Sequence, residues 1–185
     1  MKRRLILASS GALLLTGCTS ATIHNWRIAA IPGPVQGGNG ARISVRSIGL
    51  PSALNQPGIP EPGPANAANS FVNDLWAAPL AAMLQTSMVE NLAQRLPADV
   101  ILADGGAIGA TPDQFVEIQI LAFSPDEAGI VALQAQLAIR PFNSQNWTLK
   151  SFQANAPGGL TAGTITACMS QLWGQAANQL AIMLR

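Results

Sequence analysis

The residues that could perform catalysis are few in this chain. Its 185 residues include one histidine and two cysteines, and they include no tyrosine. A serine or cysteine nucleophile needs a base held against it, and His24 is the only imidazole that could serve. No G-x-S-x-G sequence, which would place a serine on a sharp strand-to-helix turn, occurs in the chain. Catalysis by a nucleophile and a histidine base is therefore disfavoured.

Residues that could bind a metal ion are also few. A zinc site needs several cysteine or histidine ligands, and the chain offers His24, Cys18 and Cys168. His24 is expected on an exposed strand close to the start of the chain. Cys168 falls within a helical pattern of apolar residues, which favours a buried structural thiol over a nucleophile.

Glycine and acidic residues give no stronger signal. Glycine pairs at 105–106 and 158–159 form neither G-x-G-x-x-G nor a P-loop, and turns account for them. The acidic pairs are Asp99/Asp104 and Asp126/Glu127, and the second pair lies in an expected hairpin turn, where Asp is common. We therefore expect a protein that is not an enzyme, with no catalytic residue, no bound cofactor and no metal.

Cys18 is the one residue with a clear chemical role. Three positive residues, Lys2, Arg3 and Arg4, precede an apolar stretch over 5–15, and residues 15–18 read Leu-Thr-Gly-Cys. The apolar stretch has eleven residues, whereas a spanning helix needs about twenty. This order is typical of an export signal, and its last four residues resemble the lipobox of bacterial lipoproteins. The alternative, a plain secreted protein, would need small residues in an A-x-A arrangement at the cleavage site.

A lipobox implies cleavage before Cys18, with diacylglycerol in thioether linkage and an N-acyl chain on the new terminus. Several acyl chains make membrane attachment essentially permanent. The next residue is Thr19, whereas an Asp there resembles an inner-membrane retention signal, so we expect the periplasmic face of the outer membrane. The chain then divides into a signal peptide (1–17), a lipidated tether (18–23) and a single domain (24–185).

The composition of the exported part limits the kinds of molecule that it could bind. Removal of residues 1–17 leaves 168 residues, with seven Lys and Arg against nine Asp and Glu, a formal net charge of −2. That balance argues against nucleic acid, which requires a basic surface. Charged residues make up 10% of the chain, against about 25% in a typical domain, which hints at a homo-oligomer or a permanent partner.

Hydrophobic periodicity predicts the elements. Helical spacing over 73–96 predicts a long amphipathic helix headed by Trp76, with Pro79 in its first turn. A second helix follows a cap at Thr161 or Thr164 and runs to the end of the chain. Residues 49–69 contain five prolines and predict an extended segment with one or two short bridges. The expected strands cover 24–31, 42–48, 100–103, 115–123, 129–140 and 147–155.

This order of elements predicts an α+β fold. Residues 115–123 and 129–140 alternate apolar and polar side chains across a short turn, which indicates an antiparallel hairpin. Two helices with one apolar face each must cover one face of the sheet. The expected architecture is a two-layer sandwich of an antiparallel-rich sheet and two long helices, with a long proline-rich loop.

Several short motifs occur in one order behind the lipobox: Trp26-Arg27-Ile28, Pro32-Gly33, Ile43-Ser44-Val45, Leu50-Pro51-Ser52-Ala53-Leu54, Trp76-Ala77-Ala78-Pro79-Leu80, Glu90-Asn91-Leu92 and Leu96-Pro97. In this order the chain resembles the PqiC/YmbA-type family of auxiliary lipoproteins of ABC-type, MCE-linked lipid transport systems. The chain departs from the family at Leu75 and Ala78, where Arg and Glu are usual, so a polar partner contact there would be missing or replaced.

The resemblance implies a non-catalytic subunit that supports membrane integrity. Its partners would be an MCE-domain protein that spans the periplasm and, through it, an ABC permease and ATPase that move phospholipids. Candidate contact residues are Leu50, Pro51, Leu54 and Trp76, although core packing is the stronger interpretation of Trp76. Two alternatives stay open, namely a lipoprotein that itself binds a lipid or hydrophobic ligand and a purely structural envelope lipoprotein.

Overall fold

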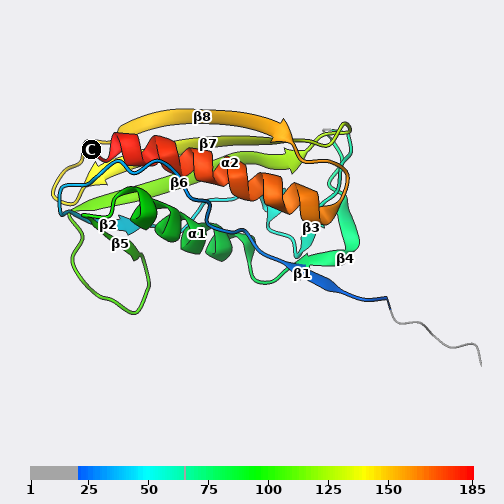
Figure 1. Ribbon diagram of the computed structural model, residues 1–185, viewed down its shortest axis with the longest axis horizontal. Coiled ribbons are helices and arrows are strands. Elements are labelled where there is room, and N and C mark those ends of the chain that lie inside the picture. Colours follow the sequence, from blue (N-terminus) through cyan, green and yellow to red (C-terminus); the bar gives the residue numbers. More distant parts are fainter. Residues whose placement is uncertain (1–20, 65) are drawn as a thin grey trace, which may run out of the picture.

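The computed structural model describes residues 21–64 and 66–185, so Cys18 and the signal peptide lie outside the described residues. Within the described residues, eight strands, one 3-10 helix and two α-helices form an α+β fold (Figure 1). In chain order they are β1 (His24–Trp26), β2 (Arg42–Val45), η1 (Ser52–Leu54), β3 (Gly58–Pro60), β4 (Ser70–Trp76), α1 (Leu80–Arg95), β5 (Val100–Ala103), β6 (Gln114–Pro125), β7 (Ile130–Pro141), β8 (Thr148–Pro157) and α2 (Ala162–Met183).

The larger sheet has five strands in the order β5-β2-β6-β7-β8. Its long central hairpin, β6 and β7, is antiparallel, and β8 pairs antiparallel with β7. Strand β2 pairs parallel with both β5 and β6, so the sheet is mixed. Alternation along the hairpin places Val116, Ile118 and Ile120 in the core and exposes Gln119, which confirms the predicted pattern.

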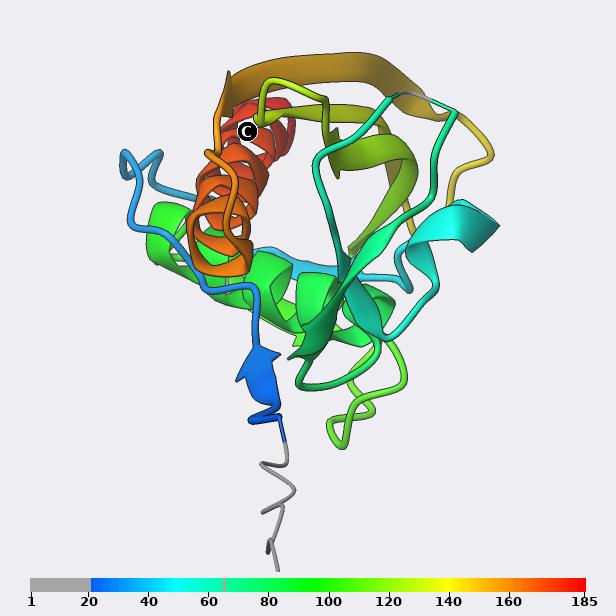
Figure 2. The same ribbon diagram turned by 90° about the vertical axis from the view of Figure 1, so that its right-hand side faces the viewer.

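Both helices pack against this sheet and against each other (Figure 2). Thr161 caps α2 by accepting a hydrogen bond from the backbone N–H of Thr164, as one of the two predicted caps. Trp173 of α2 is fully buried, and its indole N–H donates to the carbonyl oxygen of Leu84 in α1 at 3.1 Å. The expectation of two helices over one side of an antiparallel-rich α+β sheet is therefore confirmed.

A second, smaller sheet was not predicted. It has the order β1-β4-β3, with β1 parallel to β4 and β3 antiparallel to it. The predicted helix over 73–96 is therefore wrong at its start, because residues up to Trp76 belong to β4 and α1 begins at Leu80. The predicted strand over 24–31 also ends early, at Trp26.

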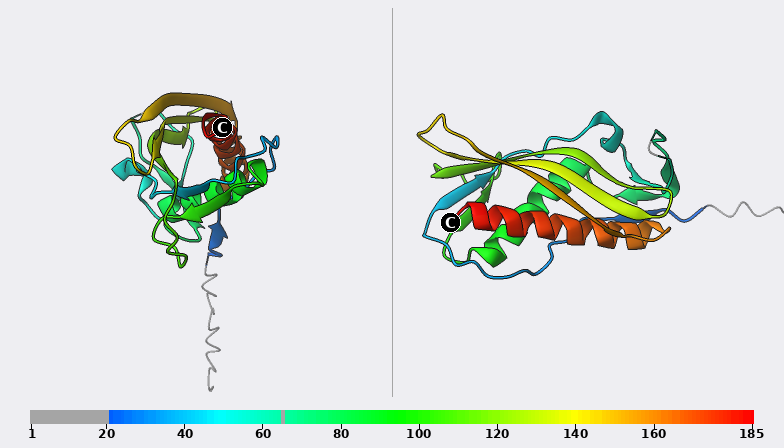
Figure 3. Two further views of the ribbon diagram at one scale, coloured as in Figure 1. Left: turned by 90° about the vertical axis from the view of Figure 1, so that its left-hand side faces the viewer. Right: turned by 90° about the horizontal axis from the view of Figure 1, so that it is seen from above.

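The ends of this elongated molecule differ in what they carry. The chain enters at the end where α2 begins, beside β4, and the C-terminus lies at the opposite end (Figures 1 and 3). Strands β6, β7 and β8 run the length of the molecule between these ends. The small sheet and the turn between β6 and β7 therefore lie at the entry end.

Candidate functional site

The proline-rich segment folds into one wall of a pocket. Pro51 precedes the 3-10 helix, and its carbonyl oxygen accepts the backbone N–H of Leu54 at 3.0 Å. Strand β3 follows and carries Ile59, which is fully buried. The expected extended segment with short bridges is confirmed, and it is anchored in the core by Leu54 and Ile59.

A bulge in β6 shapes the opposite wall. The pairing of β6 with β7 shifts between Ile120 and Ala122, and Leu121 is left 52% exposed. The extra residue bends the strand and redirects the side chains that follow it. Phe123 is buried beyond the bulge, where its ring lies 6.4 Å from that of Trp173.

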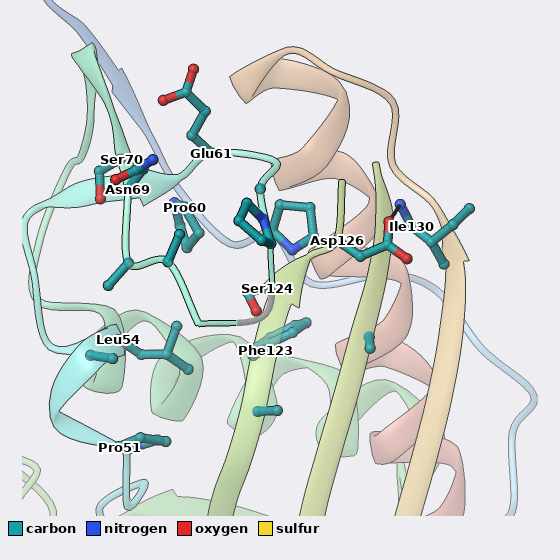
Figure 4. Close-up of a pocket in the computed structure, with 18 of the residues that line it drawn as sticks. Pro51, Leu54, Pro60, Glu61, Asn69, Ser70, Phe123, Ser124, Asp126 and Ile130 are labelled. Atoms are coloured by element: carbon teal, nitrogen blue, oxygen red, sulfur yellow. Dashed lines mark hydrogen bonds between the residues drawn. The ribbon is translucent and has the colours of Figure 1, made fainter. Parts of the chain in front are cut away.

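A pocket of about 500 Å³ lies between the two walls (Figure 4). Such a volume is typical of small-ligand sites. Most of its lining is proline, alanine, leucine and other small or apolar residues. The lining residues are Pro51, Ala53, Leu54, Gly58, Pro60, Glu61, Gly63, Pro64, Ala67, Ala68, Asn69, Ser70, Leu121, Ala122, Phe123, Ser124, Pro125, Asp126, Ile130, Ala132 and Asn155.

The charged lining groups are acidic. Glu61 and Asp126 lie at the rim, above Leu54 and Phe123 in Figure 4, and the lining includes no Lys, Arg or His. The Asp126 carboxylate accepts the backbone N–H groups of Ala128 and Ile130 at 2.9 and 2.8 Å, which fixes it in the hairpin turn. The pocket therefore suits an apolar group attached to a neutral or cationic one.

The structure brings together two of the four predicted contact residues. Pro51 and Leu54 line the pocket, and Leu54 is only 8% exposed. Leu50 packs partly buried against the core and is not in the lining. Trp76 ends β4 instead of heading a helix, and its exposed fraction is 6%. This burial agrees with the core-packing interpretation of Trp76.

Sequence reasoning missed the wall contributed by the hairpin. The signal was present, because apolar positions follow a period of two through Ile118 and Ile120 and then skip to Phe123. A slip of one residue in a strand marks a bulge, and bulges redirect side chains next to sites. What the sequence did not indicate was that residues 51–70 lie opposite this bulge.

The two residues considered for catalysis lie on different elements, His24 on β1 and Cys168 on α2. The side chain of His24 is 58% exposed, and its Nδ1 lies 3.4 Å from the Asp74 carboxylate. Cys168 is buried in α2, and burial raises the pKa of its thiol, which keeps it protonated. Among residues 21–64 and 66–185, no three His, Cys, Asp or Glu side chains group as metal ligands.

No helix within residues 21–64 and 66–185 is both long enough and apolar enough to cross a bilayer.

The end of the sheet away from the pocket carries arginines and aromatic rings. The Arg140 guanidinium lies 4.9 Å from the centre of the Phe115 ring and 5.1 Å from that of Trp147. Nearby, Arg42 forms two side-chain hydrogen bonds to Asp113, at 2.8 and 3.1 Å. These bonds and the Arg42 backbone N–H lower the pKa of Asp113 to about 2. Paired charges of this kind stabilise an exposed surface.

Two solved structures share the fold. One is an uncharacterised protein with 16% identity and a TM-score of 0.76, covering 89% of this chain and 100% of its own. The other is protein XCC0632 from Xanthomonas campestris, of the DUF330 family, with 18% identity and a TM-score of 0.69, covering 87% and 93%. No curated protein matches the sequence.

The sequence itself matches a defined family. Residues 28–181 match the family described as the ABC-type transport auxiliary lipoprotein component. The match extends from just after β1 to near the end of α2, so it includes the five-stranded sheet, β3 and β4 of the smaller sheet, α1, most of α2 and the pocket. The chain therefore belongs to the family of ABC-type transport auxiliary lipoprotein components.

Proposed function

We propose that this chain is a non-catalytic subunit of an ABC transport system that moves lipids between membranes. In this role it is held by acylated Cys18 at the periplasmic face of the outer membrane, where it docks an MCE-domain protein. The observation that carries the proposal is the family match over residues 28–181. A separate permease and ATPase would supply the energy, so this chain needs only to bind and position.

The 3-10 helix and its flanks are the proposed docking segment, defined as residues 50–56. Ser52 and Ala53 are both exposed, Ala53 at the edge of the pocket that it helps to line, while Leu54 is buried in the pocket wall. The segment therefore presents an outward surface on a backbone fixed by a buried anchor. A fixed surface loses little conformational entropy when a partner binds.

Photo-crosslinking in cells tests this proposal. The probe belongs at Ala53, because Leu54 is buried and a bulky probe there would disturb the wall. A photo-reactive amino acid at Ala53 should capture an MCE-domain protein, identified by mass spectrometry. The same amino acid at Ala110, which is exposed on the loop between β5 and β6, is the control and should not capture it.

The other outcomes separate the remaining functions. Capture of only further copies of this chain from Ala53 would favour a self-assembling structural lipoprotein. Capture of no transport component from either position, with the protein correctly placed in the membrane, would contradict the docking role.

A further inference from the structure

The pocket lies close to the point where the chain leaves for its anchor. In the small sheet, β1 is separated from β3 only by β4, so two strand spacings of about 5 Å each divide the tether from a pocket wall. His24 pairs with Asp74 in a parallel register, so the chain ahead of His24 runs toward the Ser70 end of β4. Ser70 lines the pocket.

The length of the remaining chain keeps the membrane near. Cys18 precedes Ala21 by three residues, and three residues span at most about 11 Å. Acyl chains on Cys18 would therefore hold the membrane surface close to the pocket rim. A ligand that enters from this side comes from the lipid bilayer.

Large apolar side chains are exposed at the same end. Ile23 is 58% exposed beside β1, Val72 is 89% exposed on β4, and Leu160 is 65% exposed just before α2. The start of α2 adjoins β1, because a side chain at Gly163 would meet the ring of Trp26. Exposed apolar residues of this kind insert readily into the boundary of a bilayer.

The chemistry of the lining selects the ligand class. Prolines at 51, 60 and 64 lack backbone N–H donors, so the rim offers few hydrogen bonds to an extended peptide. A hydrocarbon chain needs no hydrogen bonds. The two rim carboxylates, Glu61 and Asp126, would repel a headgroup whose only charge is the negative phosphate. They would attract a headgroup that also carries an ammonium group.

We infer that this pocket takes one acyl chain of a phospholipid whose headgroup carries an ammonium group facing Glu61 and Asp126. This inference rests on the proposed lipid-transport function and gives that function a substrate-binding site. The chain would pass from the bilayer beside β1, over the rim, and lie against Ala132 and Phe123.

The test uses the full lipidated protein in vesicles of equal parts phosphatidylethanolamine and phosphatidylglycerol. A diazirine on the acyl chain is carried by the ethanolamine lipid in one sample and by the glycerol lipid in the other. After illumination, mass spectrometry locates the labelled residues. Label should appear on both walls of the pocket, in residues 58–70 and in residues 121–132. The ethanolamine lipid should give about threefold more label than the glycerol lipid, because an exposed pair of opposite charges rarely strengthens binding by much more than that factor.

Two variants that fill the pocket sharpen the result. Ala132→Phe places a ring inside it and should lower labelling of the walls by about tenfold. Ala68→Phe does the same from the exposed rim, where folding is not at risk, and it keeps the test decisive if Ala132→Phe unfolds. Ala110→Phe, on an exposed loop outside the pocket, is the matched control and should leave labelling unchanged.

Other results overturn the inference. Wall labelling that survives both pocket variants, or label confined to residues 19–27, would show lipid contact through the anchor alone. Absence of label on both walls, as when a peptide or second copy occupies the pocket, would also overturn it. Equal labelling by the two lipids would remove the ammonium assignment. The vesicles hold no transport partner, so failure here leaves the Ala53 capture experiment, and the proposed function, untouched.

Discussion

The guanidinium group of Arg95 joins three segments in the interior. Arg95 is 1% exposed, and it donates hydrogen bonds to the side chain of Asn178 and to the carbonyl oxygens of Ile31, Asn91 and Gly174, at 2.6 to 3.1 Å. These acceptors belong to α1, α2 and the segment after β1. Burial lowers the pKa of Arg95, but an arginine side chain stays charged in proteins. The acceptors named above are carbonyl and amide oxygens, so their dipoles, and not a carboxylate, compensate the positive charge.

Replacement of Arg95 should therefore be among the costliest single changes in the protein. Arg95→Ala leaves several buried acceptors without donors, and we expect the free energy of unfolding to fall by about 3 kcal/mol or more. Arg27→Ala removes an exposed arginine and should change it by less than about 0.5 kcal/mol. Urea unfolding followed by tryptophan fluorescence measures both. Equal effects would show that the buried hydrogen bonds of Arg95 make no net contribution to the free energy of unfolding.

The Arg42–Asp113 pair makes a pH-dependent contribution at the far end of the sheet. The folded pKa of Asp113 is about 2, below its ordinary 3.8, so the ionised carboxyl stabilises the fold fully above pH 3.8 and loses that effect between 3.8 and 2. Asp113→Asn should therefore lower the free energy of unfolding at pH 7, and the difference should shrink as the pH falls toward 2. A difference from wild type that is independent of pH would contradict this.

At the scale of elements, the hairpin turn links the sheet to α2. Gly129 has φ +74°, its carbonyl oxygen accepts the backbone N–H of Gly158 at 2.8 Å, and an added Cβ would collide with the carbonyl of Gly159. Gly105 has the same φ and open space around it. Gly129→Ala should cost about 3 kcal/mol and Gly105→Ala about 1 kcal/mol.

Thermal or urea unfolding of the two glycine variants separates backbone strain from close contact. Strain is shared by both positions, so the excess at Gly129 reports the collision with Gly159. If the two variants lose the same stability, the turn is free to move away from the start of α2, and the close packing seen between them is not required by the fold.

Elements with local signals could be predicted from the sequence. The strand at 100–103 and the helix cap at Thr161 follow from patterns within a few residues, and both are confirmed. Residues 70–76 could not be placed in this way, because Trp76, Leu80 and Leu84 share helical spacing. Their extended shape comes from pairing with β1, about fifty residues earlier in the sequence, and with β3, which ends ten residues before β4 begins.

The pocket was half predictable for the same reason. The sequence predicts Pro51 and Leu54 as partner contacts and not as pocket residues, and both lie in the lining. The other wall comes from β6 and β7, more than fifty residues further along. A single sequence reports contacts between near neighbours through its periodicity, whereas it carries no comparable signal for which distant segments form two facing walls.

At the scale of the whole molecule, the end proposed to face the membrane and the exposed charged end lie at opposite ends of the long axis. The tether, the exposed apolar side chains and the pocket gather at the entry end, whereas the Arg42–Asp113 pair and the Arg140 cluster lie at the far end of the sheet. A protein anchored by its first residue would hold its pocket toward the bilayer. Its charged end would then face the periplasm, so the proposed roles depend on attachment through Cys18.

Loss of the anchor tests that arrangement directly. Replacement of residues 1–18 by a signal peptide that is cut at an A-x-A site gives an exported protein with no lipidated cysteine. We expect this variant to move from the membrane fraction to the soluble periplasmic extract. Each buried methylene of an acyl chain contributes about 0.8 kcal/mol to attachment, far more in total than the few exposed apolar side chains could replace. Cys168→Ala removes the other, buried cysteine and should leave the protein in the membrane fraction. If the variant with the replaced signal peptide stayed with the membrane until detergent released it, the fold would itself hold the bilayer, and the orientation argued from the tether would need another basis.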